Sequence, residues 1–122
     1  MSNSILLYVT DAAASARYYE RILGRKPAEA SPTFAIFILK SGLGLGLWGR
    51  DGVMPAPTAS GGGSEIGFKV DTAEEVDQWH AEWSANGATI LMPPAELDFG
   101  RSFLATDPDG HRLRVYTVTD GA

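Results

Sequence analysis

The chain contains no cysteine, so neither disulfide bonds nor thiol chemistry can contribute to its fold or its function. It has no apolar run long enough to span a membrane, and its first residues lack the basic flank and the cleavage site of a signal peptide. Acidic residues outnumber basic ones by 15 to 10, and a net charge of -5 argues against nucleic-acid binding, because phosphate contacts need a basic surface. We expect a cytoplasmic protein with no membrane and no nucleic-acid partner.

What the chain does have is a pattern of strand, helix and strands that occurs twice. With 122 residues, 44% of them hydrophobic, it is long enough for one real core and too short for two independent domains. Residues 51–63 are rich in proline, glycine and small residues, which is typical of a connection between modules or a mobile lid. We expect one domain over residues 1–122, with modules at about 4–50 and 64–118.

The expected elements follow from hydrophobic spacing and from capping residues. Asp11 can cap a helix that Gly24 ends, and Thr72 or Asp71 can cap the second helix, which Asn86 and Gly87 end. We expect two helices, at residues 12–23 and 73–85. We expect strands at residues 4–10, 33–40, 43–49, 65–70, 88–92, 101–106 and 111–118.

The strand LGLGLWG, residues 43–49, places two glycines and Trp48 on one face. Glycine weakens a strand interior, so two on one face indicate that something approaches closely there. One interpretation is close packing of the protein's own atoms over Gly44 and Gly46. The other is a floor cleared for a flat ligand, with Trp48 as the stacking wall.

The last strand has an unusual polar face. Residues 107–110 (DPDG) form a tight turn, and beyond it Leu113 and Val115 share one side of a strand. The opposite side carries Arg112, Arg114 and Tyr116. Two guanidinium groups and a phenol on a half-buried strand need a partner.

The stretch DFGRSFLATDPDGHRLRVY, together with SEIGFKVDTAEEVDQWHAEWSANGA at residues 64–88, resembles the glyoxalase/bleomycin-resistance/dioxygenase superfamily, also called vicinal oxygen chelate. More narrowly, it is similar to phenazine-antibiotic-binding resistance proteins. The resemblance implies an α+β fold of two βαβββ modules whose curled mixed sheets form a cup. It also implies a homodimer in which each cup takes one module from each chain.

In metal-using relatives, four residues converge in the cup, and the resemblance places these positions on Ser4 (or Ile5), Gly46, Glu65 and Arg114. Only Glu65 could ligate a cation, and Arg114 would repel one. His80, in the middle of a helix, and His111, after the turn, are expected to be ordinary surface or half-buried residues. We therefore expect no metal and no other cofactor.

If these positions converge, Glu65 and Arg114 meet at the former metal site as a charge-assisted, bidentate pair. The alternative is that both side chains lie on the sheet rim, solvated and contributing little.

These observations favour a metal-independent protein that binds and sequesters a planar aromatic molecule or antibiotic, an anionic one included, and so confers drug resistance. We assign no catalytic residue, although Glu65 could act as a lone general base. An enzyme of the same superfamily, including one whose metal site this register misses, and a structural dimer without a ligand are the alternatives. The candidate binding residues, with Arg112 as a further donor, are Tyr8, Gly46, Trp48, Glu65, Phe99, Arg101, Phe103, Arg114 and Tyr116.

Overall fold

The computed structural model describes residues 2–119 and divides into two compact units between Gly61 and Gly62. Each unit has the order strand, helix and three strands, with two four-stranded mixed sheets in all, which confirms the α+β fold of paired βαβββ modules. Whether the two units act as one domain stays a prediction. Among the described residues, no helix is long and apolar enough to cross a membrane.

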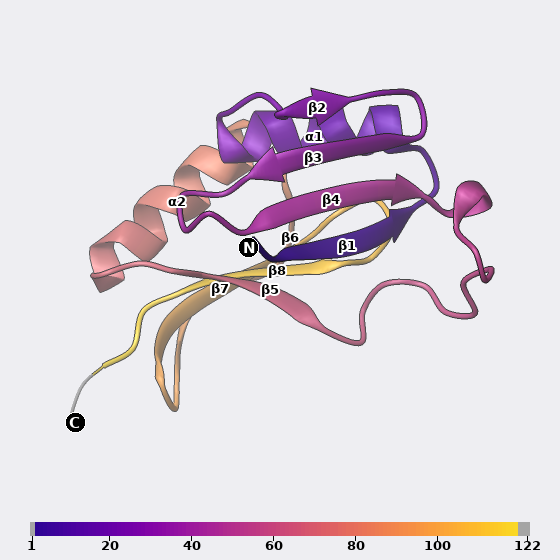
Figure 1. The fold of residues 1–122 in the computed structure, drawn as a ribbon. Helices are drawn as coiled ribbons and strands as arrows, with labels where there is room; N and C mark the ends of the chain where they lie inside the picture. The colour runs from indigo at the N-terminus through magenta and orange to yellow at the C-terminus, as the bar shows by residue number, and fades with distance from the viewer. Residues whose placement is uncertain (1, 120–122) are drawn as a thin grey trace. The chain divides into compact units, whose positions relative to one another are not determined.

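Unit 1 consists of one sheet and one helix, followed by a short 3-10 helix. Its sheet has the order β1-β4-β3-β2, in which β1 and β4 are parallel and the other pairs antiparallel. Helix α1 covers one face of this sheet (Figure 1). The elements are β1 (Ser4–Val9), α1 (Ala12–Leu23), β2 (Glu29–Ala30), β3 (Phe34–Ile38), β4 (Gly44–Gly49) and η1 (Arg50–Gly52).

Helix α1 begins and ends where capping chemistry places it. The Asp11 carboxylate accepts a hydrogen bond from the Ala14 N–H at 3.0 Å. Gly24 ends the helix in the left-handed conformation (φ 67°) and donates its N–H to the Glu20 carbonyl. The inner side of α1 is fully buried at Tyr19, whose ring lies 6.3 Å from that of Phe37 on β3.

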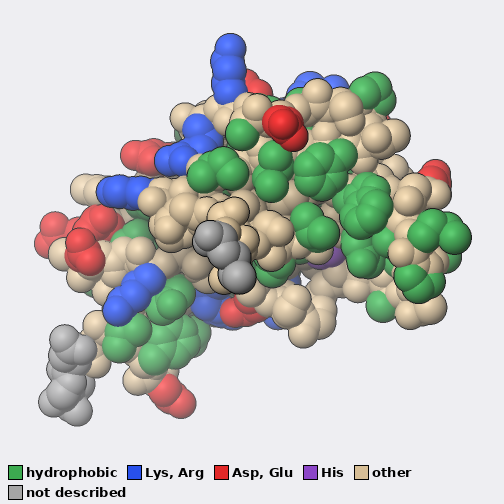
Figure 2. Space-filling view, viewed as in Figure 1, with side chains coloured by type: hydrophobic (Ala, Val, Ile, Leu, Met, Phe, Trp, Pro, Cys, Tyr) green, Lys and Arg blue, Asp and Glu red, His purple; other side chains and the backbone are tan. Residues whose placement is uncertain are grey.

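The helix-free face of the unit 1 sheet is apolar. Hydrophobic side chains gather over β3 and β4 in Figure 2. Leu6 and Tyr8 of β1 and Ile38 of β3 remain 44%, 37% and 45% exposed. An exposed apolar patch of this kind is typical of a surface that binds something.

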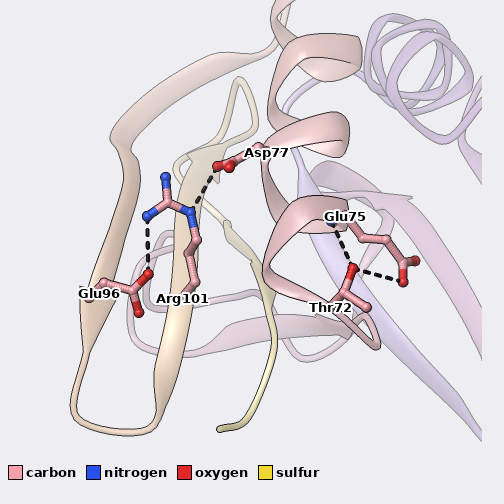
Figure 3. A network of polar contacts seen from close by, with 5 residues as sticks. All are labelled: Thr72, Glu75, Asp77, Glu96 and Arg101. Carbon is pink, nitrogen blue, oxygen red and sulfur yellow. Dashed lines mark hydrogen bonds and ion pairs between the residues drawn. The ribbon is translucent and has the colours of Figure 1, made fainter.

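Unit 2 repeats the arrangement with the sheet order β5-β8-β7-β6, in which β5 and β8 are parallel. Helix α2 packs on one face, where Trp83 is buried against the rings of Phe68 and Phe103. The Thr72 hydroxyl caps α2 by accepting from the Glu75 N–H at 3.2 Å (Figure 3). The elements are β5 (Glu65–Lys69), α2 (Ala73–Ala85), β6 (Thr89–Leu97), β7 (Gly100–Thr106) and β8 (Arg112–Tyr116).

Apart from shifts of one or two residues at the ends of strands, the structure differs from the expected elements in three places. The short strand β2 was not expected, and β6 runs to Leu97 although a strand was expected only to residue 92. A register shift between Met92 and Ala95 lets β6 pass two prolines and still pair with β7. The expected connection at 51–63 is also partly ordered, because η1 enters it and Val53 is buried.

Candidate functional site

The polar face predicted for the last strand is the helix-free face of unit 2. Strand β5 lies beside β8 in parallel register, with Glu65 opposite Arg112 and Gly67 opposite Arg114. Because strand side chains alternate, Glu65, Gly67, Arg114 and Tyr116 share this face. Leu113 and Val115 of β8 point to the other face and are fully buried.

Glu65 and Arg114 form the bidentate pair that the sequence predicts. Arg114 donates from Nε to Glu65 Oε1 and from Nη2 to Glu65 Oε2, both at 2.7 Å. A third hydrogen bond runs from Arg114 Nη1 to the hydroxyl of Ser102 on β7 at 2.9 Å, and Ser102 is fully buried. The Arg114 and Glu65 side chains are 19% and 34% exposed, so the pair is neither deeply buried nor free on a rim.

The pair fixes the charge state of both groups. The hydrogen bond from Arg114 lowers the pKa of Glu65 below its ordinary value of 4.5, and the charges of Arg114 and Arg112 act in the same direction. The same hydrogen bond raises the pKa of Arg114. Glu65 is therefore a carboxylate at neutral pH and does not carry a proton that it could give to a substrate.

An open hollow of about 460 Å³ lies over this pair. Phe99 and Tyr116 form an aromatic corner in it, with ring centroids 5.9 Å apart and planes at 85°. Apolar walls above a charged floor suit a small, flat ligand. The lining residues are Glu65, Gly67, Phe99, Arg114, Tyr116 and Val118.

Backbone contacts hold Phe99 at the edge of the hollow. The Phe99 carbonyl accepts a hydrogen bond from the Thr119 N–H at 2.8 Å. Two residues further along, the Arg101 carbonyl accepts one from the Thr117 N–H at 3.0 Å. Gly100 has φ 145°, and a Cβ there would lie only 2.2 Å from the Thr117 carbonyl oxygen. Only glycine allows this close approach of the β6–β7 turn to the chain after β8.

Glycine also shapes the floor beside Tyr116. A Cβ on Gly67 would lie 3.0 Å from Tyr116 Cε1, so the phenol ring rests on the backbone of β5. Gly67 is not among the binding residues predicted from the sequence. Ser102 and Val118 were not predicted either. Alternation from Tyr116 could have indicated Val118, whereas Ser102 reaches this face through the register of β7 on β8.

Two predicted binding residues lie on the other face of the unit 2 sheet, under α2. Arg101 donates to Asp77 of α2 at 2.9 Å and to Glu96 of β6 at 3.2 Å (Figure 3). Phe103 is fully buried, with the ring of His80 5.3 Å away. Arg101 and Phe103 are therefore not brought together with Phe99, Arg114 and Tyr116, although they lie only two and four residues beyond Phe99.

The remaining predicted residues belong to unit 1. Trp48 and Tyr8 are paired across β4 and β1, with ring centroids 6.2 Å apart. A Cβ on Gly46 would lie 2.6 Å from Leu6 Cδ2 and 3.3 Å from the ring of Phe34. The space above Gly46 is therefore filled by the unit's own side chains, which corresponds to close packing and not to a floor cleared for a ligand.

The residues at the positions that the resemblance predicts for a metal do not fit a metal ion. Gly46 has no side chain, Arg114 is cationic, and both oxygens of Glu65 already accept from Arg114. Within residues 2–119, no group of three or more His, Cys, Asp or Glu side chains is placed to hold one. We derive no chemistry through a metal at this site.

Comparison with known proteins agrees with the fold. The model of the Glyoxalase/Bleomycin resistance protein/Dioxygenase superfamily matches residues 2–115, and the chain belongs to this superfamily. The phenazine antibiotic resistance protein EhpR of Enterobacter agglomerans is 31% identical over 118 residues, which cover 93% of this chain and 88% of EhpR.

Solved structures are also similar. Protein ATC0852 from Agrobacterium tumefaciens is 44% identical, with a TM-score of 0.85 and 98% of each chain covered. A glyoxalase-related enzyme from Fulvimarina pelagi has a TM-score of 0.83 at 24% identity, covering 96% of this chain and 87% of its own. This second likeness bears on the fold alone.

Proposed function

We propose that the protein binds a planar aromatic small molecule without a metal and protects against it by sequestration. The observation that carries the proposal is the hollow of unit 2, in which Phe99 and Tyr116 stand over the Glu65–Arg114 pair. An aromatic corner can stack on a flat ring system, and the polar floor can fix its orientation. The 31% identity to a phenazine antibiotic resistance protein supports the same ligand class.

Tyr8 and Trp48 remain part of this proposal as a second aromatic surface, in unit 1. A protein that only binds the compound does not destroy it, so each protein molecule protects against a fixed number of compound molecules. Protection should therefore be stoichiometric. Cells should tolerate the compound only up to an amount comparable to that of the protein. The cytoplasmic location stays a prediction.

Calorimetric titration of the full chain with phenazines tests the proposal. Phe99→Ala should weaken binding about two- to thirteenfold, since a stacking contact contributes about 0.5–1.5 kcal/mol beyond area burial. Leu97→Ala is the matched control, because Leu97 is 37% and Phe99 38% exposed and only Phe99 lines the hollow. Absence of binding, or equal losses in the two variants, would contradict the proposed site.

A second measurement separates binding from catalysis. The phenazine is recovered after incubation with the protein, with and without added Fe, Mn, Ni or Zn, and analysed by mass spectrometry. Unchanged compound is the expected result. Formation of a product that depends on added metal would establish the enzyme alternative in place of sequestration.

We also propose that the chain forms a homodimer. Support comes from the apolar helix-free face of unit 1, where Leu6, Tyr8 and Ile38 are exposed. Analytical ultracentrifugation should give a dimer, which Leu6→Asp together with Ile38→Asp should dissociate. A monomer at every concentration would refute this proposal and would leave the ligand site of unit 2 to be judged by the titrations.

A further inference from the structure

The charge on the floor of the hollow is already balanced by the chain itself. Arg114 uses Nε and Nη2 on the two oxygens of Glu65 and Nη1 on the hydroxyl of Ser102. The guanidinium therefore keeps one unused N–H on each of Nη1 and Nη2, and the Glu65 carboxylate keeps lone pairs beyond those that accept from Arg114. A ligand in the hollow meets a donor and an acceptor side by side, with no net charge.

A ligand carboxylate fits this floor poorly. To use Arg114 fully it would have to displace Glu65, which would leave the Glu65 carboxylate without its partner and beside a second negative charge. If Glu65 stays in place, the incoming carboxylate can only use the remaining N–H groups and still faces Glu65. Either way a like charge opposes binding.

An uncharged group that both donates and accepts avoids this conflict. An aromatic carboxamide can accept from a free N–H of Arg114 and donate to an oxygen of Glu65 while the ion pair stays intact. We propose that the hollow selects a neutral planar aromatic ligand that carries a hydrogen-bond donor beside an acceptor, and discriminates against the corresponding carboxylate. This inference rests on the proposed binding function.

Two further cations share the helix-free face of unit 2 but do not line the hollow. Arg112 is opposite Glu65 and Lys69 is opposite Tyr116 in the β5–β8 register, and both are exposed. Because exposed charges are solvated and screened by salt, they add little to the affinity for an anion. Lys69 supplies the control for the role of Arg114 and Glu65, because Arg112 lies directly opposite Glu65 and its charge lowers the pKa of Glu65.

The test compares phenazine-1-carboxamide with phenazine-1-carboxylate by calorimetry at neutral pH, using the full chain. The carboxamide should bind at least tenfold more tightly, which is about 1.4 kcal/mol. Glu65→Gln removes the opposing charge and should reverse the preference toward the carboxylate. Lys69→Ala should leave the ratio of the two affinities within about twofold.

The outcomes separate this inference from the function on which it rests. If neither compound binds the wild-type protein, the proposed function fails, and the ligand class with it. If both bind and the carboxylate is preferred, or if a folded Glu65→Gln protein keeps the wild-type ratio, the selection for a neutral ligand is refuted and binding stands. The wild-type comparison decides the question even if Glu65→Gln does not fold.

Discussion

Replacing Arg114 by alanine tests the ion pair on which the site depends. Exposed ion pairs contribute about 0.2–1 kcal/mol, whereas breaking a buried pair costs about 3–5 kcal/mol. The Arg114 and Glu65 side chains are 19% and 34% exposed, so this pair lies between an exposed and a buried ion pair. Arg114→Ala also removes a hydrogen bond to the buried Ser102 hydroxyl, worth about 1 kcal/mol. We expect a loss of about 2–3 kcal/mol in the free energy of unfolding.

The double variant Glu65→Gln with Arg114→Met should lose only about 1 kcal/mol, because it removes both charges and leaves neither without a partner. Urea unfolding followed by far-UV circular dichroism gives both values. As a control, Lys69→Ala, which removes an exposed cation on the neighbouring strand β5, should stay within about 0.5 kcal/mol of wild type. Losses that are negligible, or equal in the single and the double variant, would mean that the pair is solvated and does not shape the hollow.

Three further predictions concern acid stability, a turn and a helix cap. Folding lowers the pKa of Glu65, so the stability that this group contributes is complete above its ordinary pKa of 4.5 and is lost as pH falls through the lowered pKa. Between about pH 5 and pH 3, wild type should therefore lose more stability in urea titrations than Glu65→Gln, and parallel curves would contradict this. Gly100→Ala should cost more than about 2 kcal/mol, because its Cβ would meet the Thr117 carbonyl, while Gly63→Ala, with nothing within 4 Å, should change the thermal midpoint little. Thr72→Ala should cost about 1 kcal/mol by removing the cap of α2, and an unchanged urea midpoint would count against that role.

The Glu65–Arg114 pair bears on how members of one superfamily can differ. At two of the positions that the resemblance predicts for a metal, unit 2 has a carboxylate already engaged by a guanidinium. The pair supplies orientation and hydrogen bonding without a bound ion. A hollow of this kind fits ligand capture, and the phenazine titrations decide whether capture is what it does.

Local sequence determined the elements and the polar face. Helices α1 and α2 span the residues that the sequence predicts, because Asp11, Gly24 and Thr72 satisfy the free backbone groups at their ends. Alternation in β8 placed Arg114 on the polar face, because the side-chain period of a strand is two. The resemblance to the superfamily, which brings the positions of Glu65 and Arg114 together, predicted that the two would meet, and they do.

Only the tertiary structure decided which face of β7 meets the helix. Ser102–Ala105 offers an apolar residue to either side, so alternation alone could not assign Phe103 to the core or Arg101 to its partners on α2 and β6. Phe99 enters the hollow through a turn whose path depends on the chain after β8. Side chains from two other strands, Leu6 and Phe34, likewise fill the space above Gly46. Local sequence could not predict this packing, because such contacts join residues that are far apart in the sequence.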